Sequence, residues 1–566
     1  MKKIISVLLL LATLVLSLAS CGGKKGTDTE ATAGETEPAS AAPGTTAGAT
    51  TAEATLDPKW DEIARSVQVI IEKDRTLKIE LSNHSDAEKT SKNDKYVVGP
   101  DEVILGTTPW IEQLVYERNK AACDLLQVKP EYTYWDYAWS EQAEQIKTVV
   151  QGNASDAPDL FVNMISDLNV ANLNGVFKDI RSIPNSFFDF EAKGWMTDYM
   201  NSLSLTGDRS YVLAGDYFLD ILRALGVIPV NVTMMNANAE KLAPAILSED
   251  DPLDAGEQLS TRFFDFVEEG KWTWDVLGKL CEAIWVDENN DGQDSITDVL
   301  GIVADNHGGL TSEMYIFSAS EDNLFDVRKI EDASSPYNGE DWIYYSEDPT
   351  ALGRIFDAVA AVYAGKGSVG TKNNYDGSTP ENPGATYHRI KFAEGTLLTA
   401  GTVVLGALED EQFQQMEDLF TVVPLPKISE EKHYNTCIHT IGDAGAINVH
   451  VNPRKARAIS AFLQYNCENS AEIRREFLET VMKYKTTVYN QGTDRMLDII
   501  YDSVITGRDK MIEDCVGTDR RFFWIMMRGN SEVTSSELVS NYASYIKTKQ
   551  AKLDKILATW YELPKS

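Results

Sequence analysis

The sequence predicts an α/β protein with two large lobes, preceded by an export signal and a segment without a core. Three observations support this prediction. Of its 566 residues, 43% are hydrophobic and 9% aromatic, which supplies enough apolar surface for packed cores. A single core stops growing at about 250–300 residues, so a chain of this length is expected to divide. After Trp60, strand-like and helix-like stretches alternate along the chain.

The beginning of the chain has the features of a secretory signal. A basic start at residues 1–3 (MKK) precedes an uncharged, apolar run that is short for a membrane-spanning helix. The run ends in residues 18–22 (LASCG), which resemble the bacterial lipobox. The resemblance implies that the signal peptide, residues 1–20, is removed and that Cys21 is acylated, with palmitate among its lipids. The alternative is an ordinary cleaved signal followed by an incidental cysteine.

Residues 21–59 are expected to form a disordered tether behind this lipid anchor. The stretch is rich in Gly, Thr, Ala, Glu and Pro and has almost no large apolar side chain, so it cannot form a core. A solvated segment of this kind holds a globular body off a membrane.

Charge and cysteine usage exclude several classes of function. The chain carries 87 acidic and 52 basic residues, a formal charge of −35, which argues against nucleic acid as a partner. The five cysteines beyond Cys21 are separate from one another and form no C-x-x-C pair, so a zinc cluster has no support and free thiols are expected. Motifs of the forms H-E-x-x-H, G-x-S-x-G and G-x-x-x-x-G-K-[ST] do not occur.

The first part of the body has a repeating order of strands and helices. Residues 77–81 alternate apolar with charged side chains, and residues 102–107 have the pattern of a buried strand entering a loop. Apolar positions from Ile111 to Leu126 have the spacing of one helix face. A strand, a helix and a strand are then expected at residues 129–135, 142–150 and 158–163. This order implies a mainly parallel sheet, which binds ligands beyond the carboxyl ends of its strands.

Three stretches, taken in order, carry a family resemblance. Residues 157–180 contain a Pro-Asp-apolar strand, a glycine and an acidic-apolar turn, and residues 270–275 (GKWTWD) precede an apolar helix. The longest stretch runs over residues 392–448, and Asn452 and Pro453 then suit the start of a helix. The set resembles the extracellular solute-binding proteins of ABC importers, family 1, the group that includes maltose-binding protein.

The resemblance implies a two-lobed, type II periplasmic-binding-protein-like fold with hinge crossovers. Lobe 1 would hold residues 60–225 and 438–480, and lobe 2 residues 226–437 and 481–566. It also implies a monomeric receptor, and not an enzyme, on the extracellular face of the cell membrane of a bacterium. Such a receptor captures a solute, here expected to be an oligosaccharide, and delivers it to the transmembrane subunits of an ABC permease.

Polar and aromatic side chains at the expected strand ends are the candidates for solute binding, because sugars offer apolar faces and many hydroxyls. The candidates that follow expected strands are Thr108, Trp110, Asn163 and Asp167. The family resemblance implies three more at the cleft, which are Asp216, Tyr217 and Thr402. Asp167 matches a sugar-binding acid of the family, whereas Asn163 stands where the family has an aromatic residue. Each candidate has a structural alternative: Trp110 packs under a helix, Asp167 caps one, or Asp216 ends a turn.

Residues 287–298 match the pattern of a calcium-binding loop. Positions 1, 3, 5, 9 and 12 would supply side-chain oxygens, from Asp287, Asn289, Asp291, Ser295 and Asp298. Position 7 would supply the backbone carbonyl of Gln293. Gly292 falls at position 6, where such a loop turns sharply. We expect a structural Ca²⁺ here, and the alternative is an acidic turn that ends a helix.

Two other classes of function stay open at this stage. A surface glycoside hydrolase or another carbohydrate-active enzyme would need two facing carboxylates, and the sequence singles out no pair among its many acids. A passive adhesion or scaffolding lipoprotein would need neither a cleft nor a pair.

Overall fold

The computed structural model describes residues 58–82, 94–135, 141–152, 156–304, 325–346, 348–370, 387–486, 490–505, 507–517 and 534–563. The predicted signal peptide, Cys21 and nearly all of the predicted tether lie outside the described residues. The first helix begins at Pro58, slightly before the expected end of the tether. None of the helices in the described part of the chain combines the length and the apolar character that crossing a membrane requires.

A four-stranded sheet organises the first lobe. Its order is β11-β3-β1-β2, with β1 (Thr76–Ser82) parallel to both β2 (Lys129–Trp135) and β3 (Leu160–Met164). β11 (Asp443–Ile447) runs antiparallel to β3 and returns from far along the chain. The predicted mainly parallel sheet is therefore confirmed, and β1 is a central strand with neighbours on both sides.

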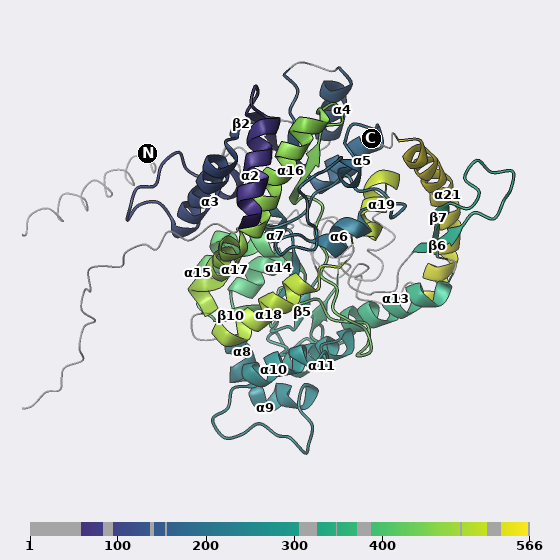
Figure 1. Cartoon of the computed structure of the whole chain (residues 1–566). Helices are drawn as coiled ribbons and strands as arrows, with labels where there is room; N and C mark the ends of the chain where they lie inside the picture. The colour runs from purple at the N-terminus through teal and green to yellow at the C-terminus, as the bar shows by residue number, and fades with distance from the viewer. Residues whose placement is uncertain are drawn as a thin grey trace, which may run out of the picture. The chain divides into compact units, whose positions relative to one another are not determined.

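Helices cover this sheet (Figure 1): α2 (Pro58–Ile70), α3 (Trp110–Leu126), α4 (Gln142–Gln151), α5 (Ile165–Asn172) and α16 (Pro453–Glu468). The predicted helices after β1 and β2 are confirmed. α16 begins as expected, because the Asn452 side chain accepts a hydrogen bond from the Lys455 N–H at 3.0 Å and Pro453 occupies the first turn. Its face of Ile459, Leu463 and Cys467 is buried.

The expected strand at residues 102–107 is wrong. These residues form bends and turns, with Ile104 and Leu105 exposed. The apolar run is too short to decide between strand and turn, and Gly106 adopts a φ of 81°, which ends an extended conformation. The Thr108 hydroxyl then accepts a hydrogen bond from the Ile104 N–H at 2.9 Å and closes the turn.

A second, antiparallel sheet organises the other lobe. Its order is β10-β4-β9, with β4 (Gly226–Asn231) between β10 (Phe420–Val423) and β9 (Val403–Val404). Around it pack α8 (Val232–Ala237), α10 (Leu259–Glu268), α11 (Trp274–Ile284) and the short parallel pair β5 (Ile302–Val303) and β8 (Ser368–Val369). Trp272 and Trp274 are buried, and the Trp272 indole donates to the Pro424 carbonyl at 2.9 Å. Both are core residues.

Two crossing segments join the sheets and pair with each other. The Gly226 N–H donates to the Cys437 carbonyl at 2.8 Å, and the His439 N–H donates to the Ala224 carbonyl at 2.8 Å. Residues 224–226 and 437–439 therefore run side by side between the two sheets. The lobe boundaries stay predictions, but this antiparallel pair lies where the expected crossovers fall. An α/β fold with two sheets and paired crossings agrees with the expected fold class.

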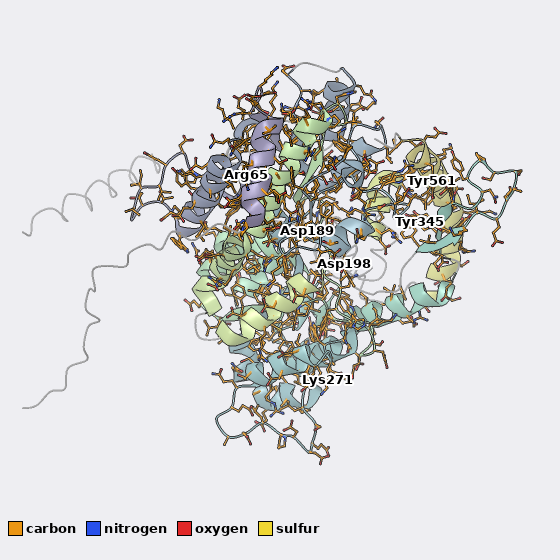
Figure 2. All side chains as sticks on the ribbon, viewed as in Figure 1. Arg65, Asp189, Asp198, Lys271, Tyr345 and Tyr561 are labelled. Atoms are coloured by element: carbon orange, nitrogen blue, oxygen red, sulfur yellow. The ribbon has the colours of Figure 1, made fainter. Side chains whose placement is uncertain are left out.

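The C-terminal region contains α17 (Ala471–Thr486), α18 (Asn490–Asp502), α19 (Arg508–Val516) and α21 (Ser535–Glu562). α21 packs against α13 (Pro349–Ala364), against α19, and against the hairpin of β6 (Phe325–Lys329) and β7 (Asp341–Tyr345). Figure 2 shows Tyr345 and Tyr561 on this side of the molecule, away from Lys271. α19 in turn packs against α5, so the C-terminal helices contact elements of both lobes.

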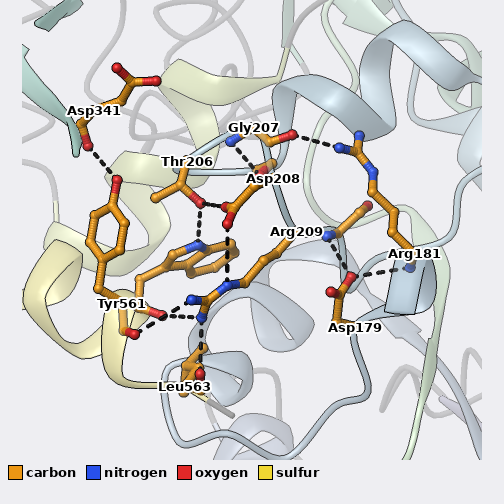
Figure 3. A network of polar contacts seen from close by, with 12 residues as sticks. Asp179, Arg181, Thr206, Gly207, Asp208, Arg209, Asp341, Tyr561 and Leu563 are labelled. Atoms are coloured by element: carbon orange, nitrogen blue, oxygen red, sulfur yellow. Dashed lines mark hydrogen bonds and ion pairs between the residues drawn. The ribbon is translucent and has the colours of Figure 1, made fainter. Parts of the chain in front are cut away.

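One buried arginine fastens the end of α21 (Figure 3). Arg209 is 2% exposed, and one of its terminal nitrogens donates to the carbonyls of Trp560 at 2.8 Å and Leu563 at 3.0 Å. The Trp560 indole donates to the Thr206 hydroxyl at 3.0 Å, and the Tyr561 hydroxyl donates to the Asp341 carbonyl at 2.7 Å. The last turn of α21 is thus held by the segment that precedes the crossing and by β7.

The remaining short elements connect these units. They are η1 (Asp94–Val98), η2 (Ile180–Ser182), α6 (Thr197–Ser202), α7 (Asp220–Arg223), α9 (Ala239–Leu242), η3 (Ala243–Ala245), α14 (Tyr387–Ala393), η4 (Leu405–Glu409) and α15 (Glu411–Gln415).

Candidate ligand-binding site

Buried polar side chains gather where the strands of the first sheet end. Glu80 lies near the carboxyl end of β1, Asn163 near that of β3, and Asp443 at the start of the antiparallel β11. Asp167 follows in the first turn of α5. We call Glu80, Asn163, Asp167 and Asp443 the carboxyl-edge cluster. All four are at most 5% exposed, and they occupy the edge at which parallel sheets bind ligands.

Glu80 is the most unusual member of this cluster. Burial raises the pKa of its carboxyl well above the ordinary value, and the neighbouring carboxylates of Asp443 and Asp167 raise it further. A hydrogen bond from the Asn163 amide to Oε2, at 3.4 Å, opposes these effects. These effects favour the protonated form of the Glu80 carboxyl, which can act as a hydrogen-bond donor.

The second oxygen of Glu80, Oε1, is buried and has no hydrogen-bond partner among the described residues. Leaving a buried polar atom unsatisfied costs about 1–3 kcal/mol, so such atoms are uncommon in folded proteins. A hydroxyl group of a bound solute would supply the missing partner. Together the cluster offers donors and acceptors at one place, which is the chemistry that a polyhydroxylated molecule needs.

Asp167 has the structural role that was its alternative interpretation. Its Oδ1 accepts a hydrogen bond from the Ala143 N–H at 3.1 Å, which satisfies one of the free donors at the start of α4. Asn163 likewise uses its Oδ1 to accept from the Met164 N–H at 2.8 Å. These bonds fix both side chains at the edge. A solute contact by either residue stays a prediction.

Asp216 and Tyr217 lie outside this cluster. The Asp216 carboxylate is fully buried and accepts hydrogen bonds from Arg474 at 2.6 Å and from the Tyr501 hydroxyl at 2.8 Å. The ring of Tyr217 is also buried, and the Arg118 guanidinium stacks 4.9 Å from its centre. The described contacts of both residues thus hold the protein together, and a ligand role for them stays a prediction.

No described contact joins the carboxyl-edge cluster to the other three candidates, Thr108, Trp110 and Thr402. Thr108 closes the turn before α3. Trp110 begins α3 and is 50% exposed, so it does not pack under a helix. Thr402 is 6% exposed and lies next to β9 in the second sheet. Their predicted contacts with a solute are therefore untested by this arrangement.

Sequence reasoning missed Glu80 and Asp443. The alternation of Leu77, Ile79 and Leu81 with charged residues predicts a strand with one solvated face. β1 is instead a central strand that is covered by helices, so its glutamate is buried. A charged side chain in the middle of an expected parallel sheet is the signal that could have found it.

In the predicted calcium loop, the carboxylates accept hydrogen bonds from backbone N–H groups of the loop itself. Asp287 accepts from the Gly292 N–H at 2.7 Å, Asp291 from the Gln293 N–H at 2.7 Å, and Asp298 from the Ser295 N–H at 2.8 Å. Gly292 has the positive φ, 75°, that position 6 requires. Within the described residues no three His, Cys, Asp or Glu side chains converge as a metal site. Calcium binding by this loop stays a prediction.

Two further features bear on other functions. The five cysteines from Cys123 to Cys515 are free thiols, as expected. Residues 365–370 form a G-x-G-x-x-G pattern, but it joins the end of α13 to β8, whereas dinucleotide sites place this pattern between a strand and a following helix.

A separate surface groove of about 490 Å³ lies between α10 and α18. Its lining includes Tyr434, Arg495 and Asp498. Arg495 is paired with Asp265 at 2.8 Å and also with Glu268. No lining residue belongs to the carboxyl-edge cluster.

The comparisons with known proteins gave structural neighbours only. No family model matches the chain, and no curated protein matches it. Among solved structures, the chain is similar to the ABC substrate-binding protein Lmo0181 from Listeria monocytogenes in complex with cycloalternan. That match has 14% identity and a TM-score of 0.41, and covers 84% of this chain and 99% of the other.

Two more neighbours are of the same kind. A family 1 extracellular solute-binding protein from Bifidobacterium longum subsp. infantis matches with 13% identity and a TM-score of 0.46, over 86% of this chain and 99% of its own. A cyclo/maltodextrin-binding protein complexed with maltotetraose matches with 12% identity and a TM-score of 0.46, over 83% of this chain and 97% of its own. The solved structures that this chain is similar to thus include several solute-binding proteins.

Proposed function

We propose that this chain is the solute-binding lipoprotein of an ABC importer. It captures an oligosaccharide at the carboxyl edge of its parallel sheet and delivers it unaltered to the permease. The observation that carries the proposal is the carboxyl-edge cluster, above all the buried Glu80 carboxyl with one oxygen that has no described partner. A cluster of this kind is costly for a protein that binds nothing there.

The chemistry of the cluster favours a neutral, hydroxyl-rich solute. A protonated Glu80 donates a hydrogen bond, and carboxylate and amide oxygens accept hydrogen bonds from hydroxyl groups. Several such bonds, none of them strong alone, orient a sugar without forming or breaking a covalent bond. Release then needs only that the lobes separate.

The paired crossings supply a mechanism for capture. Residues 224–226 and 437–439 connect the two sheets and are linked to each other by backbone hydrogen bonds. A change of backbone angles there would rotate one sheet towards the other. A solute that contacts both lobes favours the closed state by the difference between its affinities for the closed and the open form.

The anchor completes the proposal. A lipid on Cys21 and the segment before α2 would keep the receptor at the outer face of the cell membrane as a monomer beside its permease. Replacing Cys21 by Ser would remove the lipid, and the protein would then appear in the medium or the soluble fraction. Equal membrane association of both forms would contradict the anchor.

One observation favours a second candidate function, hydrolysis of an oligosaccharide. Glu80 has a raised pKa and lies close enough to Asp443 and Asp167 for their charges to act on it. A protonated carboxyl beside an ionised one is the pairing that glycoside hydrolases use. Glu80 is fully buried, so both candidate functions require the carboxyl edge to open before a sugar can reach it.

Binding and product analysis together test both functions. Maltotetraose and cycloalternan, the sugars named with two of the similar structures, are suitable first probes. The receptor is expected to show a raised melting temperature with an active probe and to return that sugar intact. Fragments of the sugar after incubation would support the hydrolase instead, and their disappearance in Glu80→Gln would assign the acid.

A further inference from the structure

An exposed apolar loop precedes α3. Ile104 is 52% exposed, Leu105 86% and Trp110 50%. Single exposed apolar side chains are ordinary, but three large ones within seven residues form a patch of the kind that marks a contact surface. Gly106 lies at the tip with a φ of 81°, and a side chain added there would meet nothing within 4 Å. We call residues 104–110 the apolar tip.

Internal hydrogen bonds fix the conformation of the apolar tip. The backbone N–H groups of Thr107 and Thr108 both donate to the Ile104 carbonyl, at 3.0 and 2.9 Å. The Thr108 hydroxyl accepts from the Ile104 N–H at 2.9 Å, and the Gln113 side chain donates to the Thr108 carbonyl at 2.6 Å. The backbone groups at the base of the loop are satisfied internally, so its apolar side chains can leave water without exposing them.

The tip lies at the end of the body where the chain from Cys21 enters. α2 and α3 pack together and run in the same direction, because Gln68 near the end of α2 donates to the Leu125 carbonyl near the end of α3, at 3.0 Å. Trp110 begins α3 and Pro58 begins α2, each at the end opposite to this hydrogen bond. The tip and the start of α2 therefore lie at the same end of this helix pair.

We propose that the apolar tip inserts into the outer surface of a phospholipid bilayer and so orients the receptor on the membrane. This inference rests on the lipid anchor of the proposed function. Residues 22–57 separate Cys21 from Pro58, and a random coil of that length spans about 33 Å on average, so a lipid on Cys21 would keep Pro58 within reach of the membrane. Two aliphatic side chains and a tryptophan are the combination that enters the boundary between headgroups and acyl chains.

The negative charge beside the tip favours zwitterionic over anionic lipid headgroups. Asp101 and Glu102 are exposed beside the tip, and the whole chain is strongly negative. Anionic headgroups would repel these groups, whereas a zwitterionic phosphatidylcholine surface would not. Insertion is thus driven by apolar contact and is expected to weaken as anionic lipid is added at low salt.

An environment-sensitive dye tests the proposal on the full, lipidated chain. Thr107→Cys places the dye inside the tip at an exposed residue and leaves all three apolar side chains in place. Val69→Cys is the matched control, because Val69 is 78% exposed and lies at the far end of α2. Protein without an added cysteine gives the background from the native thiols. Flotation with phosphatidylcholine vesicles measures the anchor separately.

In these vesicles, the dye at residue 107 is expected to shift to the blue and to lose at least half of its emission to brominated acyl chains. The dye at residue 69 should stay open to iodide in water. Adding Ile104→Ser and Leu105→Ser to the labelled Thr107→Cys protein should abolish the quenching without loss of folding, because both side chains are exposed. Phosphatidylglycerol should reduce the quenching.

Each other outcome overturns the inference in a distinct way. If the protein floats but both dyes behave alike, the anchor stands and the tip does not insert. If the dye at residue 107 is protected only when the ABC permease is present in the vesicles, the tip contacts protein and not lipid. If the protein does not float, the anchor fails, and the tip proposal fails with it. Maltotetraose binding, measured in solution, reports on the solute site independently of all three.

Discussion

Asp216 and Arg474 form a buried ion pair between residues 258 positions apart in the sequence. The Arg474 guanidinium lies 2.6 Å from Oδ2 of Asp216, and the Tyr501 hydroxyl donates to Oδ1 at 2.8 Å. The contacts tie the segment before the first crossing to α17 and α18. Burial is the largest influence on the Asp216 carboxyl, and although Arg474 and Tyr501 oppose it, the pKa is raised to about 6.

This pKa predicts a pH dependence of stability. Because the folded value exceeds the unfolded value of about 3.9, the native state binds more protons between these limits, and stability falls as pH rises from about 4 to about 6. At 1.36 kcal/mol per pKa unit, titration of Asp216 lowers the free energy of unfolding by about 3 kcal/mol across this range. Above pH 6 this loss is complete and does not change further. Asp216→Asn should lack this fall. Urea unfolding of both proteins from pH 4 to pH 8 checks it, and parallel curves would show that the carboxyl does not titrate as described.

Glu80→Gln should be nearly neutral for folding at pH 7, within about 1 kcal/mol, because an amide resembles a protonated carboxyl in shape and in its ability to donate. The wild-type protein should lose stability as pH rises above the ordinary range of a carboxyl, since its folded pKa is raised, and the amide variant should not. Denaturant unfolding between pH 5 and pH 9 measures both.

Glu80→Gln and Glu80→Ala also test whether Glu80 donates a hydrogen bond to the solute or only fills volume beside it. If Glu80 donates to the solute, the glutamine variant keeps most of the affinity, and the alanine variant loses at least about tenfold, the equivalent of one good hydrogen bond. Isothermal titration with an active sugar decides between these outcomes. Equal affinity in all three proteins would remove Glu80 from the site.

Asp167 offers a second matched pair. Asp167→Asn keeps an oxygen that can accept from the Ala143 N–H, whereas Asp167→Ala leaves the start of α4 uncapped. The alanine variant should therefore lose about 1 kcal/mol of stability and the asparagine variant less. Both should weaken solute binding if the charge contacts the solute. Normal affinity in Asp167→Asn would confine the residue to its capping role.

Arg209 is expected to control the order of the last helix. Arg209→Met should destabilise the protein by about 2–4 kcal/mol, because the buried carbonyls of Trp560 and Leu563 lose a charged donor. Arg181→Met is the control, since Arg181 donates to the Gly207 carbonyl at an exposed site. Hydrogen exchange over residues 550–563 should accelerate strongly in the first variant only.

The calcium prediction can be tested with a substitution that spares the fold of the loop. Asp291→Asn keeps an acceptor for the Gln293 N–H but removes one charge from the proposed ligand set. Calcium should raise the melting temperature of the wild-type protein and chelation should lower it, with at least a tenfold weaker affinity in the variant. A wild-type melting temperature that millimolar Ca²⁺ does not change would leave residues 287–298 as an acidic turn.

The sequence predicted elements whose signals are local. Asn452 and Pro453 start α16, Trp272 and Trp274 are core residues, and the alternation after Trp60 yields the parallel strands. The run Val103-Ile104-Leu105 misled because a three-residue apolar stretch fits a turn as well as a strand.

What the sequence did not predict depends on long-range neighbours. Whether Glu80 faces water or a buried edge is decided by β3, which pairs beside β1, and by the helices that cover both. The partners of Asp216 and Arg209 lie 258 and 351 residues away. No spacing rule links positions at such separations, so these contacts become visible only in the folded chain.

The central claim is that this protein binds a sugar and releases it unchanged. Native mass spectrometry of the full chain with maltotetraose, cycloalternan and a mixed oligosaccharide pool measures the number of bound molecules and their mass together. The account predicts one intact oligosaccharide per chain, with occupancy reduced in Glu80→Ala. Cleaved fragments, or no bound sugar from any of these sources at millimolar concentration, would contradict it.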